Sequence, residues 1–479
     1  MGHEREIRRY HAVDARSGIS EWPGDSVLSA VDIETALAQL VAFASNTEWT
    51  DLPELVQKRA ALVLCDDLAA IVAARAEPEI VALHDGISKS AGQPEAMVFN
   101  GRGQKFDRYS SALANGCAGN WVELDEGYRR VICHAGIYCL PALLAEAESE
   151  RNSTQDLLRA LVLGYEIVAR VARAFTFSKL VLHPHGSLAA VGAAAAIASL
   201  RRVPEDVAIA AISSSATMVS PGPYTHPIKG SLVRNVWPGI AAQTGLRAVD
   251  WSEIGIRGLS SALHDVYTDA FGADADSTQL CSDLGDDWAI SDGYHKVFAC
   301  CQYGHATIEA TLKLLQQAPF ERVVAIHLET HEKARLMNNP DPNTTIAAKF
   351  SIQHIASTAA VYGGGGAEAF SSKSLHSPAI AELRHKVSTS LYEPMPDWPN
   401  DRPTRVIWTL DDGTTLSEEV MSARGGPDLP FTPDEIRVKV HAIVDDPYPA
   451  MGRALDSLLD LEAYTLSQPW DETVRGMTL

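Results

Sequence analysis

The chain has 479 residues, of which 46% are hydrophobic and 21% charged, and its formal net charge is −21. This length predicts more than one hydrophobic core, and the composition is that of an ordinary globular protein. The negative charge argues against nucleic acid and anionic membranes as partners, and no apolar run is both long enough and free enough of turn signals to predict a membrane span.

The termini and cysteines favour the cytoplasm. Residues 1–13 are charged but are not followed by an apolar stretch, so no secretory signal is predicted. The seven cysteines include no CxxC pair, which fits reduced thiols in a cytoplasmic protein.

Residues from about 32 to 220 are predicted to form a run of helices. Apolar residues recur at three- and four-residue spacing in segments 31–45 and 53–75, which is the pattern of amphipathic helices. Another helix is predicted after Ser153, because Asp156 stands three residues further on, as in a capping box. The abundant alanine and glycine let such helices pack closely.

The pattern changes near residue 280. Segments 321–331 and 404–420 alternate apolar and polar residues like strands, and the second contains Asp412-Gly413, a hairpin signal. A capped helix is predicted from about Thr432, followed by a helical tail. The sequence therefore predicts a mainly α protein, in which a helical domain (30–284 plus 429–479) carries an inserted, smaller α+β lid domain (285–428).

Segment 115–134 is the most informative part of the chain. It holds Glu123, Asp125 and Glu126, and ends at His134, directly before an apolar helix. Acidic side chains and a histidine in a loop that leads into a rigid helix suggest an active site. A solvated acidic loop with one capping histidine is the alternative reading.

Other polar clusters stand at the mouths of apolar helical runs. Helix N-termini attract anions through their free N–H groups and the macrodipole. Several such mouths that converge would form a pocket for a substrate with several carboxylates. The clusters are His183 with His185, Lys296 with His305, and Lys349 with Ser351, Gln353 and His354.

These landmarks form an ordered series over residues 35–475. The segments are "CDDLAAIVAARAEP", "ANGCAGNWVELDEG…CHAG", "GYEIVARVARAF", "HPHGSLAAVGAAAAIA", "GSLVRNVWPGIAAQTGL", "HKVFACCQYGHATIEA" and "AAKFSIQHIAS". The series resembles the MmgE/PrpD family, whose members include methylcitrate dehydratases, cis-aconitate decarboxylases and iminodisuccinate epimerases.

The resemblance implies a homodimeric, cofactor-independent enzyme with its active site between a helical domain and an α+β lid. The implied enzyme needs no metal, and the histidines and cysteines of the chain do not show the spacing of metal ligands. By motif position the resemblance implies catalytic roles for His134, His183, Lys296 and Asp125. It implies substrate-binding roles for Glu123, Glu126, Arg234, His305 and His354.

Two departures from the family pattern bear on the reaction. Arg234 stands where decarboxylase-like members carry a lysine, and His354 stands at a tyrosine position. Because arginine keeps its charge and cannot act as a neutral base, Arg234 is interpreted as a carboxylate clamp.

The sequence-based prediction is therefore a lyase that dehydrates a small di- or tricarboxylate. It would abstract a proton next to a carboxylate and release water, as a 2-methylcitrate dehydratase does. The alternatives are an epimerase of an amino-dicarboxylate such as iminodisuccinate, a cis-aconitate decarboxylase, and a non-catalytic anion-binding protein.

Overall fold

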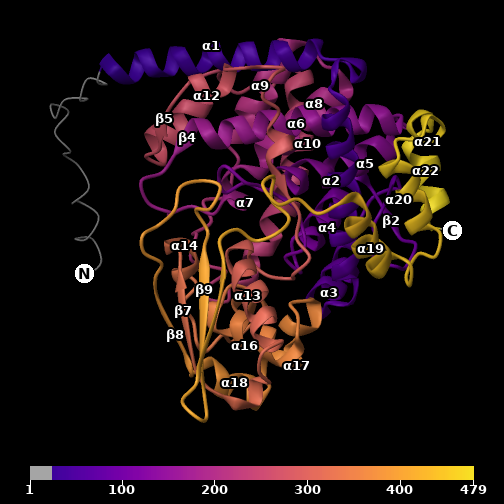
Figure 1. The fold of residues 1–479 in the computed structure, drawn as a ribbon. Helices are drawn as coiled ribbons and strands as arrows, with labels where there is room; N and C mark the ends of the chain where they lie inside the picture. The colour runs from indigo at the N-terminus through magenta and orange to yellow at the C-terminus, as the bar shows by residue number, and fades with distance from the viewer. Residues whose placement is uncertain (1–23, 479) are drawn as a thin grey trace, which may run out of the picture.

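Closely packed, alanine-rich helices form the larger part of the molecule (Figure 1). The computed structural model describes residues 24–478, so the charged segment 1–13 lies outside the described residues. The long helices are α1 (Gly24–Asn46), α2 (Glu54–Ala73), α4 (Arg108–Gly119), α5 (Ala135–Ser149), α6 (Thr154–Ala174), α8 (Ala189–Arg201), α9 (Glu205–Ala216) and α10 (Trp237–Glu253).

Shorter helices join these elements or belong to the remainder of the chain. They include α3 (Pro78–Ile87), α7 (Pro184–Ser187), α12 (Thr278–Cys281), α13 (His305–Leu315), α14 (Glu332–Arg335), α15 (Thr345–Lys349), α16 (Ile352–Tyr362), α17 (Ser372–Leu375), α18 (Pro378–Arg384), α19 (Pro433–Val444), α20 (Met451–Leu459), α21 (Ala463–Ser467) and α22 (Trp470–Thr478).

Helix α8 lies at the centre of the helical part and contacts α5, α6 and α10. Glycine allows two of these close approaches. A Cβ on Gly164 would lie 2.6 Å from the Cβ of Ala196, and one on Gly245 would lie 2.3 Å from the Cβ of Ala193. The close helix packing that was predicted from the abundant alanine and glycine is therefore present in the structure.

Two predicted helix starts are confirmed. The Ser153 side chain accepts a hydrogen bond from the backbone N–H of Asp156 at the start of α6. At the start of α19, Thr432 and Glu435 form a reciprocal capping box. Both caps satisfy N–H groups that the first turn of a helix leaves free.

A four-stranded sheet, with α13 and α16 beside it, forms the lower part of the molecule in Figure 1. The two predicted strand segments are confirmed, and Gly413 (φ 82°) stands in the predicted hairpin turn. Strand β8 was not predicted, and it is the one strand that pairs in parallel with β7. The sheet order is β10 (Thr415–Val420), β9 (Thr404–Leu410), β7 (Val323–Thr330) and β8 (Val387–Leu391).

The C-terminal helices pack against the N-terminal ones. Helices α19 and α20 contact α2, and α22 contacts α5, so the yellow end of the chain in Figure 1 lies beside indigo and violet helices. The chain therefore passes through the sheet-containing part and then returns. The division into 30–284 plus 429–479 and 285–428 stays a prediction.

A two-residue strand pair joins the acidic loop to the segment that leads toward the sheet. Strand β3 (Gly127–Tyr128) pairs antiparallel with β6 (Gly293–Tyr294). A Cβ on Gly127 would lie 2.4 Å from the hydroxyl of Tyr294, so a larger residue would displace the Tyr294 ring. This pairing brings residues 123–134 close to Lys296.

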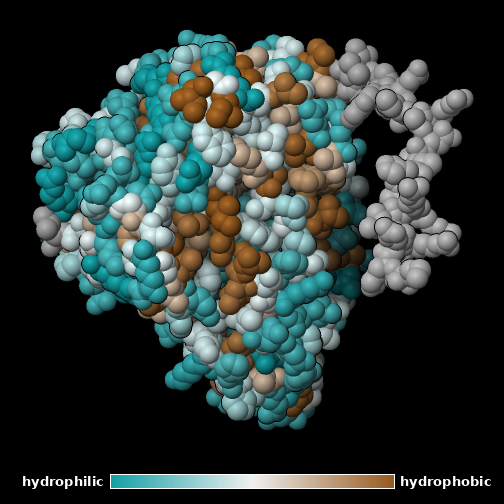
Figure 2. Space-filling model, turned by 180° about the vertical axis from the view of Figure 1, so that it is seen from behind, coloured by the Kyte–Doolittle hydropathy of each residue, from teal (hydrophilic) through white to brown (hydrophobic). Residues whose placement is uncertain are grey.

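Within residues 24–478, no helix combines the length and apolarity needed to cross a membrane. On the rear face of the molecule, groups of hydrophobic side chains lie in the middle and near the upper edge, among hydrophilic ones (Figure 2).

Candidate active site

The carboxylates of the acidic loop are buried. Glu123, Asp125 and Glu126 are at most 1% exposed, although they lie in a loop between α4 and α5. Glu123 has a φ of 57°, a left-handed conformation that non-glycine residues adopt rarely and that is often found at functional sites. The alternative reading of this segment as a solvated acidic loop is therefore wrong for its carboxylates.

Asp125 connects the loop histidine to the lysine of the distant motif. Its Oδ2 lies 2.7 Å from Nδ1 of His134, and its Oδ1 accepts a hydrogen bond of 3.2 Å from Nζ of Lys296. Burial would raise the pKa of Asp125, but the positive charges of Lys296 and His134 hold it well below its ordinary value. The ionised carboxylate favours a proton on Nδ1 of His134, which leaves Nε2 of that ring for a substrate.

Lys296 is fully buried, with Glu123 as its second acidic neighbour. Its Nζ lies 3.6 Å from Oε2 of Glu123. Burial would lower the pKa of Lys296, but Asp125 and Glu123 raise it above the ordinary value, so the amine stays protonated. Lys296 is thus a fixed cation and not a neutral base.

Arg234 lies in a short 3-10 turn, Leu232–Val236, on the other side of Glu123. Its Nη1 forms an ion pair with Oε1 of Glu123 and donates to Oδ1 of Asn120 at 3.0 Å. Its Nε donates to Nε2 of His183 at 3.3 Å. Within residues 24–478, Nη2 makes no hydrogen bond, so part of the guanidinium remains available for a substrate carboxylate.

The two histidines at the start of α7 lie next to the loop histidine. The rings of His183 and His185 are 4.6 Å apart, and His185 is 4.8 Å from His134. Burial, together with the charge of Arg234, holds the pKa of both His183 and His185 well below the ordinary histidine value. Both imidazoles are therefore neutral near pH 7.

Five of these residues surround one small cavity of about 40 Å³, which Asp125 and His185 do not line. That space holds about one water molecule, so a polycarboxylate can bind only if the surrounding side chains move. The predicted residues that line the cavity are Glu123, His134, His183, Arg234 and Lys296.

The cavity also has walls that the sequence analysis missed. Arg402 forms a hydrogen bond to Gln302, donates to the carbonyl of Arg129 at 3.2 Å, and places its guanidinium carbon 5.0 Å from the ring centre of Tyr303. Arg402 precedes β9 in a proline-rich segment without any helix-mouth signal. The other lining residues are Tyr128, Val131, Ile132, Tyr224, Tyr294, Cys301, Gln302, Tyr303 and Phe350.

Three residues with predicted substrate-binding roles do not line this cavity. Glu126 accepts hydrogen bonds from the backbone N–H of Gly136 and the hydroxyl of Tyr165. His305 points back to the carbonyl of Cys300 at 3.3 Å.

His354, in α16, lies 3.2 Å from the carbonyl of Ala369 and 3.1 Å from Nη1 of Arg384 in α18. A position at the start of a helix therefore did not identify which histidines reach the cavity. The sequence pattern does not specify which other elements pack against that helix start.

Asp125, His134 and His185 lie close enough to one another to share a metal ion, with ligand atoms within 4.8 Å. Asp125 already pairs with Lys296, and Nδ1 of His185 lies 2.9 Å from the hydroxyl of Tyr138. A protonated lysine beside the shared carboxylate disfavours a second cation there. These contacts give no support to a metal centre.

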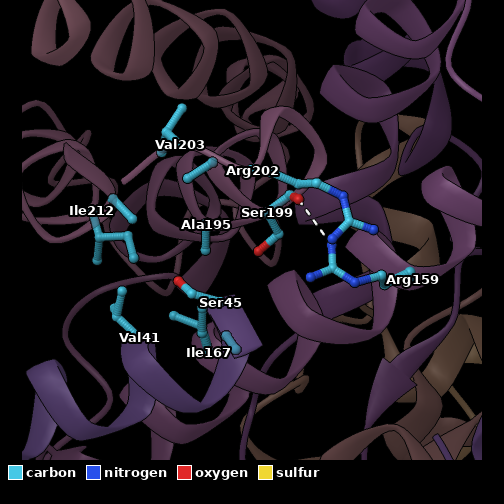
Figure 3. A pocket seen from close by; sticks show the side chains of 12 residues that line it. Val41, Ser45, Arg159, Ile167, Ala195, Ser199, Arg202, Val203 and Ile212 are labelled. Atoms are coloured by element: carbon cyan, nitrogen blue, oxygen red, sulfur yellow. Dashed lines mark hydrogen bonds between the residues drawn. The ribbon is translucent and has the colours of Figure 1, made fainter. Parts of the chain in front are cut away.

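A separate cavity of about 50 Å³ lies among α1, α6, α8 and α9 (Figure 3). Apolar side chains form most of its wall, and Arg159 donates to the carbonyl of Ser199 at 3.1 Å beside it. It contains no histidine or carboxylate and is not a candidate for catalysis.

The amino-acid sequence matches the models of two protein-family domains. Residues 38–273 match the MmgE/PrpD N-terminal domain, and residues 298–461 match the MmgE/PrpD C-terminal domain. The chain belongs to the MmgE/PrpD family. It is an enzyme of the lyase type, and the family predicted from the ordered motifs is confirmed.

Several named proteins resemble the chain over most of its length. A "cis-aconitate decarboxylase-like protein oryM" of Aspergillus oryzae is 25% identical, covering 89% of this chain and 94% of that protein. A cis-aconitate decarboxylase of Aspergillus terreus is 25% identical, covering 81% and 85%. The mouse cis-aconitate decarboxylase is also 25% identical, covering 74% and 76%.

Proposed function

We propose that the chain is a cofactor-independent lyase that removes water from a small di- or tricarboxylate after proton abstraction next to a carboxylate. The observation that carries this proposal is the arrangement of two imidazoles, His134 and His183, with the cations Lys296 and Arg234 around one cavity. Such a set offers a base, an acid and stabilisation of an anionic intermediate.

His183 is the proposed base. Its neutral state at pH 7 follows from its burial beside Arg234, and a base must be unprotonated to act. It would accept the proton of the carbon–hydrogen bond, and the electron pair would move onto the adjacent carboxylate as an enediolate. Lys296 and Arg234 would stabilise that added charge.

His134 is the proposed acid. Asp125, at 2.7 Å from Nδ1, stabilises the imidazolium form, so Nε2 can deliver a proton. The carbon–oxygen bond would break, and the departing hydroxide would take this proton and leave as water. The enediolate electrons then form the carbon–carbon double bond, which balances the reaction.

Decarboxylation is the second candidate, because the proteins similar to the chain are named cis-aconitate decarboxylases or decarboxylase-like. In that reaction, a carbon–carbon bond would break to release carbon dioxide, and an imidazolium would protonate the remaining carbanion. The same residues can serve both reactions, so product identity separates them. Epimerisation of an amino-dicarboxylate also needs two groups that transfer protons, and it leaves the mass of the substrate unchanged.

One experiment distinguishes these reactions. The purified protein is incubated with citrate, 2-methylcitrate, cis-aconitate, tartrate and iminodisuccinate, and each mixture is followed by NMR. We expect an unsaturated product formed by loss of water from a hydroxylated substrate. Release of carbon dioxide from cis-aconitate would instead support decarboxylation, and inversion without loss of mass would support epimerisation. Binding without any turnover would contradict all three.

We also propose that the chain is a cytoplasmic homodimer. Exposed apolar side chains on and after α10 support the dimer, because apolar surface that is exposed in a monomer often belongs to an interface. A single species of monomer mass by light scattering at micromolar concentration would contradict it. These side chains are Ile240, Trp251, Ile254, Ile256 and Leu259.

A further inference from the structure

A larger cavity adjoins the candidate active site. Its volume is about 640 Å³, which lies within the range of about 300–1,000 Å³ that small-molecule sites occupy. It lies between β4 (Phe175–Thr176) with the segment that follows it and α14, which Figure 1 shows on the same side of the molecule. Its apolar walls are Phe175, Phe177, Leu180, Leu182, Leu188, Ile228 and Leu336.

The two cavities share walls. Val131, Ile132 and Tyr224 line both the large cavity and the cavity that holds His134 and His183. A ligand with its reacting carbon at His183 would therefore reach the large cavity by displacing one of these three side chains, of which Tyr224 stacks on His183.

The apolar part of the large cavity does not suit the carboxylates themselves. Taking an ion away from water into apolar surroundings is costly without a partner. Arg130, Lys179, Glu332 and Lys333 also line this cavity; within the described part of the chain neither lysine forms an ion pair, whereas Arg130 pairs with Asp287. In a protein of net charge −21, the two lysines would attract an anion to this cavity, and the apolar walls would receive the uncharged part of the same molecule.

We propose that the substrate is an amphipathic polycarboxylate that carries an alkyl chain longer than a methyl group, and that this chain occupies the large cavity. The proposal rests on the proposed function, because it places the reacting carboxylates beside His183. It names the substrate class: alkyl-substituted di- or tricarboxylates. A citrate-like head alone would leave the apolar walls in contact with water.

A series of substrates tests this proposal. Citrates bearing hydrogen, methyl, butyl or hexyl at the carbon next to a terminal carboxylate are compared by calorimetric binding and by turnover. Each methylene that is buried should tighten binding about fourfold. Affinity that is flat or falls beyond the methyl compound would overturn the proposal.

The two readouts keep this proposal distinct from the proposed function. If binding tightens with chain length and no compound reacts, the cavity assignment holds and the proposed function fails. If the short compounds react and longer chains bring no gain in affinity or turnover, the proposed function holds and the cavity assignment fails.

Two neighbouring residues provide a matched pair of variants. Leu180 lines the cavity and is 36% exposed, whereas Val181 is 50% exposed and does not line it. Leu180→Asp should weaken binding of the hexyl compound by about tenfold or more and leave the unsubstituted compound within about twofold. Val181→Asp should change neither. Equal effects of both variants on the hexyl compound would overturn the proposal.

A variant that fills the cavity gives an independent check. Ile228 is partly buried and lines the large cavity. Ile228→Trp should shorten the longest chain that binds well, because the indole occupies part of the space. An unchanged preference for the hexyl compound, in a variant with a normal unfolding temperature, would contradict the assignment.

Discussion

Arg234 holds His183 from one side while the backbone holds it from the other. Nε of Arg234 lies 3.3 Å from Nε2 of His183, and the backbone N–H of His185 lies 3.2 Å from Nδ1 of the same ring. A neutral imidazole offers only one nitrogen with a free lone pair, so the two donors cannot both be satisfied at once. Because burial and the charge of Arg234 lower the pKa of His183, the ring is neutral, and only one of its two nitrogens accepts a hydrogen bond at a time.

His183→Gln should lower kcat by about 10²–10⁴-fold, the usual contribution of a positioned acid or base. The amide can accept hydrogen bonds but cannot take up a proton. Steady-state kinetics measures the effect, and thermal unfolding checks the fold. His84→Gln serves as a control, because His84 is equally buried and lies 3.3 Å from the carbonyl of Ala114. Losses of the same size in both variants would show that burial, and not proton transfer, is the reason.

Lys296→Met should reduce both activity and stability. Removing one partner of a buried ion pair leaves the other charge uncompensated, which costs about 3–5 kcal/mol, and Lys296 pairs with Asp125. Lys296 is completely buried, so its substitution should lower stability as well as turnover.

Arg170→Met is the matched control for Lys296, since Arg170 is a buried cation that is paired with Glu166 away from the cavity. It should lose stability as Lys296→Met does, but retain kcat at a temperature where both variants are folded. Normal turnover by folded Lys296→Met would contradict the role of Lys296.

Arg234→Lys should raise KM by about tenfold or more, because one ammonium cannot replace the contacts of a guanidinium fork. The side chain stays charged and continues to depress the pKa of His183, so the acid limb of the pH–rate profile should stay in place. The profile of kcat/KM between pH 5 and 9 tests this. A shift of the limb by about one unit with unchanged KM would show that residue 234 takes part in proton transfer.

The fold follows from the sequence more completely than the site does. Apolar spacing and caps such as Ser153 determine helices locally, and the Asp412-Gly413 turn determines its hairpin, so both could be predicted. Strand β8 lacked such a signal, because its pairing with β7 depends on the intervening helices. Arg402 is similar: it reaches the cavity only because it contacts Arg129 and Gln302, which are distant in sequence.

Glu126→Gln should change how stability depends on pH. Burial raises the pKa of Glu126 to about 8, with a further contribution from the charge of Asp125. A group whose folded pKa lies above its unfolded value of about 4.3 loses its contribution as pH rises through the folded pKa. The wild-type free energy of unfolding should therefore fall as pH rises from about 4 to about 8 and level off above that range, and the variant should show a shallower decline.

Urea unfolding at a series of pH values measures that slope, with Asp32→Asn as a surface control because Asp32 is exposed. Equal slopes in wild type and Glu126→Gln would mean that Glu126 is ionised throughout this range.

Activity should not depend on a metal ion. Asp125 and His134, two members of the candidate metal cluster, already bind each other, and Asp125 also binds Lys296. Dialysis against a chelator followed by assay tests this. Activity lost on dialysis and restored by a divalent cation would assign the cluster to a metal.

Deuterium exchange tests the central claim most directly, because the proposed reaction begins with transfer of a carbon-bound proton to His183. A substrate from the reactive set is incubated in deuterated water with wild-type enzyme or His183→Gln, and the carbon next to the carboxylate is followed by NMR. We predict that the wild type releases this hydrogen to solvent as product forms, and that His183→Gln slows its release by at least about 10²-fold. Undiminished release of the hydrogen by folded His183→Gln would contradict the assignment of the base.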